Sequence, residues 1–425
     1  MFRFLTLAIL SGAAALAEIH TMTLRQAINL ALKQSPDVML ARLDEQRAAD
    51  AVRIAKDPFT PKVYGGSGLA YTSGYPMSIE GSAPSIIEIR TQMALFNRQL
   101  SYQLAAAREN ARGAAIDEQS KADDVAYRTA TLFLDVQQTA RAARSVSGEV
   151  ENLVRVSESM RTRVAEGREL PIEGKRAELS VAQARQRIEE LESNQEYAES
   201  SLAIVLGFPA GDRVRAADEE VSALKAPESE QAAIATALEN SREIRRLQSQ
   251  LQARMLELKG YNSARYPSID LVAQYALLAK HNYVSFFQKF QRNNGQLGAS
   301  ITIPLLIGSG AKGYMGQAQV DIEKLRTQTN EAQNRVTVET AKAYRDVKRA
   351  ETGREVAKMD LDVAREQVTV LLAQMQEGRV PRASVDQARF TEQEKWIAYY
   401  DSENNVEKAK LTLLKQAGTI VAALR

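Results

Sequence analysis

Residues of two kinds alternate in two stretches of the chain, at about residues 62–96 and 268–306, with apolar residues at one set of positions and more polar or smaller residues at the other. The polar positions that recur at every second place are Glu88, Arg90, Gln92, Asp270 and Gln274. A period of two is typical of a β-strand. Each stretch holds two such runs, so the pattern predicts two hairpins and four strands of roughly ten residues each.

The predicted strands would have one apolar face and one polar face. This pattern fits an outer-membrane β-barrel, in which apolar side chains face lipid and polar ones face the lumen. It also fits an ordinary antiparallel sheet with one face on a core, which is the simpler interpretation of alternation alone. Four strands do not close a barrel by themselves, so the barrel interpretation requires several copies of the chain.

Outside the strands, apolar residues recur with helical spacing. Residues 23–57 are predicted as two helices broken at Pro36, with Thr23 as N-cap. Residues 97–165 and 309–377 contain no Pro, and a helix of either length would span ~100 Å at ~1.5 Å per residue. A sustained heptad repeat in both predicts coiled-coil packing. The core positions of the first repeat are Leu132, Val136, Thr139, Ala143, Val146, Val150, Leu153, Ser157, Met160 and Val164.

Two short segments, 166–171 and 377–382, separate the long helical stretches from returning helices predicted at 172–206 and 382–423. Each segment contains Glu-Gly-Arg followed shortly by Pro. A Gly followed by a Pro ends one helix and permits a sharp turn into the next. We therefore interpret both segments as the tips of long antiparallel helical hairpins.

The chain contains the same structural unit twice. Gly378 lies 211 residues after Gly167, and upstream of the strands Pro267 lies 206 residues after Pro61. Such a period is much longer than that of solenoid repeats and indicates a duplicated half. The predicted organisation is a first repeat at 18–207, a linker or small equatorial belt at 208–228 and a second repeat at 229–425.

Composition argues against several classes of chemistry. The net charge of +2 gives no strong attraction to polyanions, so no nucleic-acid partner is expected. The chain has no Cys and only two His, His20 and His281. We therefore expect no disulfide, thiol nucleophile, metal site or cofactor site. The glycine-rich segment 308–313 lacks the spacing of a phosphate loop, and we expect no catalytic residue and no enzyme activity.

The first 17 residues have the features of a secretory signal peptide. Arg3 supplies the positive charge, an apolar run follows, and Ala15-Leu16-Ala17 matches the small-x-small cleavage pattern. The apolar run is too short for a membrane-spanning helix, which needs ~20 residues. We expect cleavage after Ala17 and a mature chain that begins near Glu18, without a Cys for lipid attachment.

Taken in this order, these features resemble the TolC family of bacterial outer-membrane efflux proteins. The resemblance covers nearly all of the mature chain. Its motifs are the opening 24–32 (LRQAINLAL), the segment 264–269 (ARYPSI), the strand exit 304–310 (PLLIGSG) and the Gly-to-Ala spacing of ten residues at both tips. The first strand exit, 94–98, departs from the family pattern because it lacks the Pro and Gly of the second.

The resemblance implies a mainly α-helical fold with a transmembrane β part. Three chains would form a twelve-stranded barrel in the outer membrane of a Gram-negative bacterium and a twelve-helix α-barrel across the periplasm. It implies a passive exit duct for small molecules or proteins, in a tripartite efflux or type I secretion system. The implied partners are outer-membrane lipid, a periplasmic adaptor and an inner-membrane pump.

Three sets of candidate functional residues follow. The residues expected to dock an adaptor at the tips are Gly167, Arg168, Leu170, Gly378, Arg379 and Val380. The residues expected to face the barrel lumen are Glu88, Arg90, Gln92, Asp270 and Gln274. A possible constriction at the entrance is formed by Glu173, Ser384, Asp386 and Gln387. Family tips often carry Asp six and nine residues after the glycine. At these places the second tip has Ser384 and Gln387, with Asp386 between them, and the first tip has Glu173 and Arg176, which argues against an acidic ring that binds cations.

A function of another class fits part of the pattern. A secreted coiled-coil structural or adhesion protein would also have a signal peptide and long heptad helices. It would not need amphipathic strand hairpins at matching places in both repeats. Extraction distinguishes the two, because only the duct should fractionate with outer membranes and require detergent for release.

Overall fold

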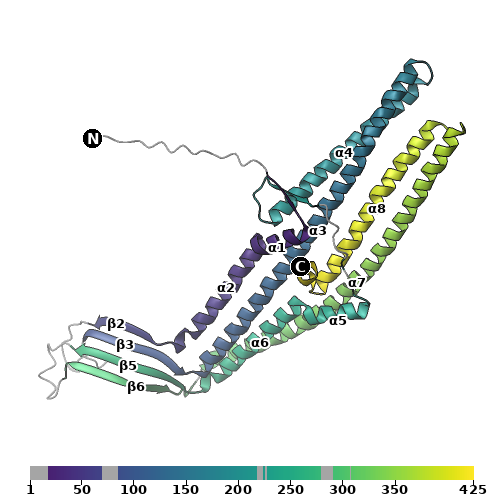
Figure 1. Ribbon diagram of the computed structural model, residues 1–425. Helices are drawn as coiled ribbons and strands as arrows, with labels where there is room; N and C mark the ends of the chain where they lie inside the picture. Colours follow the sequence, from purple (N-terminus) through teal and green to yellow (C-terminus); the bar gives the residue numbers. More distant parts are fainter. Residues whose placement is uncertain (1–17, 69–84, 218–223, 225–226, 279–290, 307) are drawn as a thin grey trace, which may run out of the picture. The chain divides into compact units, whose positions relative to one another are not determined.

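The computed structural model describes residues 18–68, 85–217, 224, 227–278, 291–306 and 308–425. The predicted signal peptide, at 1–17, lies outside the described residues. Long helices make up most of the chain, with a few strands (Figure 1). The chain divides into two units, and each takes segments from both repeats. Unit 1 consists of Met1–Leu40, Gln119–Ser241 and Asn334–Arg425, and unit 2 of Ala41–Glu118 and Arg242–Gln333.

Unit 2 contains a four-stranded antiparallel sheet in the order β2-β3-β5-β6 (Figure 1). The strands are β2 (Lys62–Gly68), β3 (Ser85–Phe96), β5 (Ser268–Leu278) and β6 (Asn293–Thr302). The central pair, β3 and β5, joins the two repeats directly. Among the described residues, β2 and β6 each pair on one side only, so both edges of the sheet remain available for another chain.

The strand register confirms the predicted two-faced sheet. Residues directly opposite each other in an antiparallel pair share a face. Arg90 lies opposite Gln274, and Asp270 lies opposite Ala94, which shares the face of Arg90. Since Glu88 and Gln92 flank Arg90 at every second position, all five predicted polar residues lie on one face.

The predicted end of the fourth strand is wrong. The alternation continues to Ile303 and Leu305, but β6 ends at Thr302. The reason is Pro304, whose nitrogen carries no hydrogen and therefore donates no hydrogen bond to a sheet. Leu305 and Leu306 are instead 90% and 94% exposed beyond the strand.

The helical part of unit 2 holds its elements together with polar contacts. Its helices include most of α2 (Pro36–Lys56), the first part of α3 (Arg98–Ala165) and α6 (Arg242–Asn262). Short 3-10 turns follow α2 at Asp57–Phe59 and α6 at Ser263–Arg265. The hydroxyl of Ser249 donates to the backbone oxygen of Glu109 at 2.9 Å. Arg246 and Asp117 form an ion pair at 3.3 Å. These contacts pack α6 against the part of the long α3 helix that belongs to unit 2.

Two long helical hairpins dominate unit 1, as predicted. The first joins α3 (Arg98–Ala165) to α4 (Pro171–Val205), and the second joins α7 (Gly308–Gln376) to α8 (Arg382–Gln416). Every predicted heptad position of α3 is buried or half-buried, so the apolar stripe faces other helices as a coiled coil requires. None of the helices in the described ranges is long and apolar enough to cross a membrane.

The returning helix predicted at 382–423 is shorter than expected. It ends at Gln416, and a separate helix α9 (Ile420–Leu424) follows. Gly418 separates the two with a φ of 67°, a left-handed conformation that favours glycine. Ile420 and Leu424 then join a buried cluster with Leu411 and Leu414.

A small sheet that the sequence analysis missed lies in unit 1. Strand β1 (Ile19–Met22) pairs in parallel with β4 (Arg213–Ala216), which belongs to the segment interpreted as a linker or small equatorial belt, without a strand. Next comes α1 (Leu24–Gln34), capped by Thr23 through reciprocal bonds with Gln26, as the sequence predicts. The corresponding helix of the second repeat is α5 (Glu230–Asn240).

The duplication appears in the three-dimensional contacts as well. A β-carbon placed on Gly207 would lie 2.9 Å from the backbone oxygen of Gln34, and one placed on Gly418 would lie 2.9 Å from that of Asn240. These two pairs are related by the same spacings as the repeats. Each glycine therefore allows the end of a long hairpin to approach the end of a short helix.

We expect Gly418→Ala to destabilise unit 1 by about 1–3 kcal/mol, because the methyl group meets backbone and the φ angle is positive. The matched control is Gly353→Ala, in the middle of α7, where a β-carbon meets nothing within 4 Å. The control should stabilise the helix by about 0.5–1 kcal/mol. Thermal unfolding followed by circular dichroism measures both effects. Equal midpoints for the two variants would contradict the close approach at Gly418.

Candidate functional site

The two hairpin tips have the same backbone structure. At the second tip Gly378 has a φ of 73°, its N–H donates to the oxygen of Met375 at 3.0 Å, and Arg379 donates to Gln374 at 2.9 Å. This pair of bonds is the Schellman motif, which satisfies the last carbonyl groups of a helix. The first tip repeats it with a φ of 71° at Gly167. A glycine is needed at both places because the left-handed conformation disfavours a β-carbon.

Both tips present an exposed cation. Arg168 pairs with Glu166 at 3.2 Å, and Arg379 pairs with Glu377 at 2.9 Å, while each arginine side chain remains 74% exposed. Leu170 is 67% exposed at the first tip. These contacts are short-range and solvated, so they contribute little to stability. The tips therefore present polar and apolar groups that packing within the chain does not require.

The predicted constriction residues lie in the first turns of α4 and α8. Glu173 pairs with Arg176 in its own helix at 2.7 Å. Asp386 lies 3.9 Å from Arg382, Ser384 is half-buried, and Gln387 is exposed. Among the described residues, the hydrogen bond and ion pair of Glu173 go to Arg176 of its own helix and not to the second tip. The structure thus places the four residues in matching turns of two hairpins without joining them into one cluster.

Burial raises the pKa of Asp386 above its ordinary value of 3.8, although Arg382 and Arg389 oppose the shift. A carboxyl group with a raised pKa in the folded state holds its proton longer than in the unfolded state. Folding stability is therefore lost as the pH rises from the pKa of the unfolded state through the higher pKa of the folded state. At neutral pH the ionised carboxylate of Asp386 therefore lowers the stability of the folded state.

We expect Asp386→Asn to raise the thermal midpoint at pH 7, because the amide removes the buried charge. The difference from the wild type should shrink as the pH falls through the raised pKa of Asp386, because the carboxyl group then takes up its proton. Thermal unfolding at several pH values measures this. The control Asp360→Asn removes an exposed partner of Lys395 and should give no such gain. A gain of equal size at pH 4 and pH 7 would contradict a role for the ionised form.

Polar contacts also join the two hairpins within unit 1. Asp135 of α3 accepts hydrogen bonds from Asn404, at 3.3 Å, and from Lys408, both on α8. Further along, Gln393 of α8 donates to the hydroxyl of Ser145 at 2.6 Å. A small apolar cluster beside them contains Ala142, Val146 and Leu191, with Ile397 packed against it. Polar side chains that the heptad pattern does not identify therefore join the two hairpins, beside an apolar cluster that includes the heptad residue Val146.

The polar face of the sheet carries the five predicted lumen residues. The amide of Gln274 donates to the carboxylate of Glu88 at 3.1 Å, and the guanidinium of Arg90 lies over the ring of Tyr64 at 5.9 Å. The opposite face is apolar and open, with Leu297 81% exposed and Ile301 64% exposed. Such exposure of large apolar side chains on a sheet indicates contact with lipid or another chain.

No group of acidic, His or Cys side chains in the described part of the chain could hold a metal ion. The candidate sites are therefore surfaces: two exposed tips and a sheet with one polar and one apolar face. Each repeat contributes one tip and one pair of strands of the sheet, at equivalent places in the sequence. A model of the family described as outer membrane efflux protein matches residues 27–208 and 233–419. The chain belongs to the outer membrane efflux protein family.

Solved structures of three other proteins resemble the chain in fold. The first is CusC, whose structures concern conformational changes during folding and transmembrane channel formation. It gives a TM-score of 0.77 at 16% identity, and the match covers 93% of this chain and 92% of the CusC chain. The CmeC outer membrane channel of Campylobacter jejuni gives a TM-score of 0.76 at 14% identity, and the match covers 93% of this chain and 85% of CmeC. The outer membrane protein VceC of Vibrio cholerae gives a TM-score of 0.74 at 15% identity, and the match covers 93% of this chain and 96% of VceC. A search among curated protein sequences gives no match.

Family membership settles the general role and place of the chain. Members of the outer membrane efflux protein family are channels of efflux systems in the outer membrane of Gram-negative bacteria, and they extend into the periplasm. The role and place expected from the sequence are thus confirmed, and the secreted adhesion protein is not favoured. The family is one of transport channels, and the residues assigned above to docking, lumen and entrance remain predictions.

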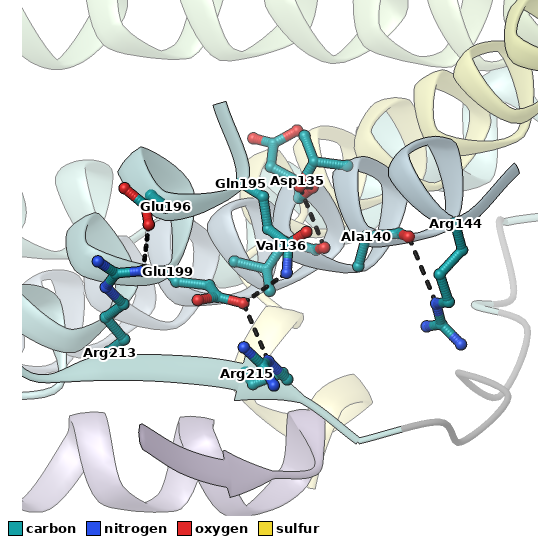
Figure 2. A network of polar contacts seen from close by, with 10 residues as sticks. Asp135, Val136, Ala140, Arg144, Gln195, Glu196, Glu199, Arg213 and Arg215 are labelled. Atoms are coloured by element: carbon teal, nitrogen blue, oxygen red, sulfur yellow. Dashed lines mark hydrogen bonds and ion pairs between the residues drawn. The ribbon is translucent and has the colours of Figure 1, made fainter. Parts of the chain in front are cut away.

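The sequence analysis overlooked a polar network beside β4. Figure 2 shows the buried Glu199 of α4, whose carboxylate accepts from Gln195 at 2.7 Å and from Arg215 of β4 at 3.3 Å. Next to it, Arg213 donates to Glu196 at 2.6 Å. Alternation of Arg with apolar residues in 213–216 was the only sequence signal, and four residues are too few for a strand prediction.

Proposed function

We propose that three copies of this chain form a passive duct through which solutes leave the cell, and that the duct itself catalyses nothing. The observation that carries this proposal is the register of the four-stranded sheet, with polar side chains on one face and exposed apolar side chains on the other. A sheet that closes around water in a membrane needs this division. The two unpaired edges of the described sheet require neighbours, and twelve strands from three chains would supply them.

The proposal assigns each face of the sheet to one environment. Glu88, Arg90, Gln92, Asp270 and Gln274 line the water-filled lumen. The exposed side chains of Leu297 and Ile301 face the acyl chains of the membrane. Charges of both signs in the lumen suit a conduit for varied solutes better than a filter for one ion.

The proposal assigns the tips to a periplasmic partner. Gly167, Arg168 and Leu170 of the first hairpin and Gly378, Arg379 and Val380 of the second would dock an adaptor protein that connects the duct to an inner-membrane pump. The support is the exposure of these groups together with their equivalent geometry at both tips. Glu173, Ser384, Asp386 and Gln387 follow immediately and would line the periplasmic entrance.

Single cysteines test the duct cleanly, because the natural chain contains no Cys. Gln274→Cys lies on the polar face and Ala273→Cys, its neighbour, lies on the apolar face. We expect a charged thiol reagent to label Gln274→Cys in membranes and to reduce the conductance of the channel in planar bilayers. Ala273→Cys should react only with a lipid-soluble maleimide. Equal labelling of the two positions by the charged reagent would overturn the assignment of the faces.

A further inference from the structure

The small parallel sheet in unit 1 begins immediately after the predicted signal peptide. The backbone oxygen of Glu18 accepts from the N–H of Arg213 at 2.9 Å, and the oxygen of Met22 accepts from Ala217 at 2.9 Å. Between these bonds β1 pairs residue by residue with β4. The first described residue of the chain is thus already held in the fold.

A carboxylate faces the nitrogen atom at this end of the sheet. The backbone nitrogen of Glu18 donates to Oδ1 of Asp212 at 3.2 Å. The other carboxylate oxygen, Oδ2, lies 3.5 Å from Nε2 of His20, a distance at which only a protonated imidazole would form an ion pair. That nitrogen is buried and makes no hydrogen bond in the structure. The His20 ring is instead stacked on Phe208, with centroids 4.4 Å apart.

Among the residues that the structure describes, no Lys or Arg pairs with this carboxylate. The two arginines that follow it in β4 are engaged elsewhere, since Arg213 pairs with Glu196 and Arg215 pairs with the buried Glu199 (Figure 2). The Asp212 side chain is only 17% exposed. Among the described residues, its recorded partners are the Glu18 nitrogen and His20. A positive charge at the Glu18 nitrogen would therefore complete the site.

Removal of the predicted signal peptide would create such a charge. Hydrolysis of the Ala17–Glu18 peptide bond by a signal peptidase consumes one water molecule. It leaves a carboxylate on Ala17 and an amino group on Glu18, which takes up a proton near neutral pH. The amino group belongs to Glu18, and the chain has no Cys that could carry a lipid at this place.

We propose that Asp212 is a binding site for the α-ammonium group that signal-peptide removal creates at Glu18, and that this ion pair completes the fold of unit 1. In the unprocessed chain the same nitrogen is a neutral amide with one hydrogen to donate. After processing it is a cation with three, and a charge-assisted hydrogen bond is roughly twice as strong as a neutral one. Capture of a terminal amine is an established mode of recognition for peptides in general.

The ion pair would lie at the start of the segment that leads into α1 and the apolar core of unit 1. Strand β1 leads directly into the capped N-terminus of α1 at Thr23. Ala27 and Ala31 of α1 lie in the largest apolar cluster of unit 1, against Phe133 and Leu202. Fixing Glu18 therefore fixes the start of a helix that covers the core, and maturation of the chain contributes to its final packing.

The reactivity of the terminal amine tests the proposal. The protein is purified from outer membranes in detergent, and its intact mass is measured first, with a chain that begins at Glu18 expected. It is then treated with an amine-acylating reagent at neutral pH, and acylation of the N-terminal peptide is followed by mass spectrometry. We expect the wild type to react about tenfold more slowly than Asp212→Asn, because an ion-paired ammonium group is protected.

A second variant separates the ammonium group from the hydrogen bond. Insertion of one Ser between Ala17 and Glu18 moves the new terminus by one residue and leaves Asp212 with a neutral amide. Its amine should react as fast as that of Asp212→Asn. The control Asp37→Asn removes a surface carboxylate that lies 4.0 Å from Arg128, and it should react as slowly as the wild type. Size-exclusion chromatography verifies that every variant keeps the assembly of the wild type.

Three results would overturn the proposal: a mature chain that does not begin at Glu18, a wild-type amine that reacts as fast as that of Asp212→Asn, or an inserted variant that stays slow. None of these results affects the channel function, which the single cysteines in the sheet test separately. A duct that conducts normally but has an unprotected terminus would refute this site alone.

Discussion

Replacement of Gly378 by Val is expected to leave a folded trimer in the outer membrane and to abolish export. The φ of 73° at this position costs any residue with a β-carbon roughly 1–2 kcal/mol, and a β-branched residue more. A β-carbon there would meet nothing within 4 Å, so the cost is backbone strain confined to the tip. A distorted tip would no longer present Arg379 and Val380 to the adaptor.

A charge reversal tests the same surface without altering the backbone. Arg168→Glu combined with Arg379→Glu places a new carboxylate beside Glu166 and Glu377, with which the arginines pair. We expect this double variant to abolish export as well. Export is measured as cellular resistance to a known substrate of the system, and assembly by heat-resistant trimers on gels. A crosslinker at Val380 or Leu170 should capture the adaptor in cells.

Two matched controls show whether a loss of export comes from the tip itself. Gly378→Asn should export normally, because Asn tolerates the left-handed conformation better than other residues with a side chain. Arg141→Glu combined with Lys358→Glu makes the same change of charge at exposed positions of α3 and α7 away from the tips, and it should also export. Normal export by the tip variants, with no adaptor captured from either tip, would show that the tips are only turns.

The second large effect is expected in the sheet. Leu297→Arg should prevent insertion and assembly of the trimer in the membrane. Leu297 lies at the middle of β6, opposite Ala273 on the apolar face, and is 81% exposed. An Arg on the lipid face of a barrel costs about 2–4 kcal/mol at the bilayer midplane. Three chains would multiply that cost.

The depth and the face of the substitution provide the controls. Ile301→Arg, on the same face but one residue from the end of β6, should cost less, about 0–1 kcal/mol near the interface. Gln296→Arg, opposite Gln274 on the polar face, should assemble and change the conductance. Assembly is measured by detergent extraction of heat-resistant trimers. Equal loss in Leu297→Arg and Gln296→Arg would contradict the assignment of the faces.

Sequence patterns predicted the regular elements well where a short period repeats many times. The heptads of α3 and the alternation of β3 each extend over several repeats, so occasional exceptions such as Ser157 and Thr91 did not obscure them. Breaks were harder to place. The end of β6 at Thr302 and the end of α8 at Gln416 depend on a single Pro and a single Gly, and the apolar pattern continues past both.

The candidate surfaces were predicted to different extents. The tips were found because Glu-Gly-Arg and a Pro are local and occur twice. The lumen residues were found because alternation identifies a face, although alternation does not distinguish an aqueous lumen from the surface of an ordinary sheet. The side chains that join the hairpins, such as Asp135 with Lys408, were missed, because charged residues occur all along these helices and sequence does not show which of them meet.

The sequence by itself determined the duplication, the long hairpins with their glycine tips, and the two-faced strands, because each follows from periodicity or turn chemistry within a few residues. Tertiary structure alone decided that β1 pairs with β4, that the nitrogen of Glu18 meets Asp212 across a separation of 194 residues, and that Glu199 is buried against Arg215. The physical reason is that each contact involves β1, β4 or a residue next to them, and these strands of four residues are too short to carry a period. They become favourable only after the long helices have brought the two segments together.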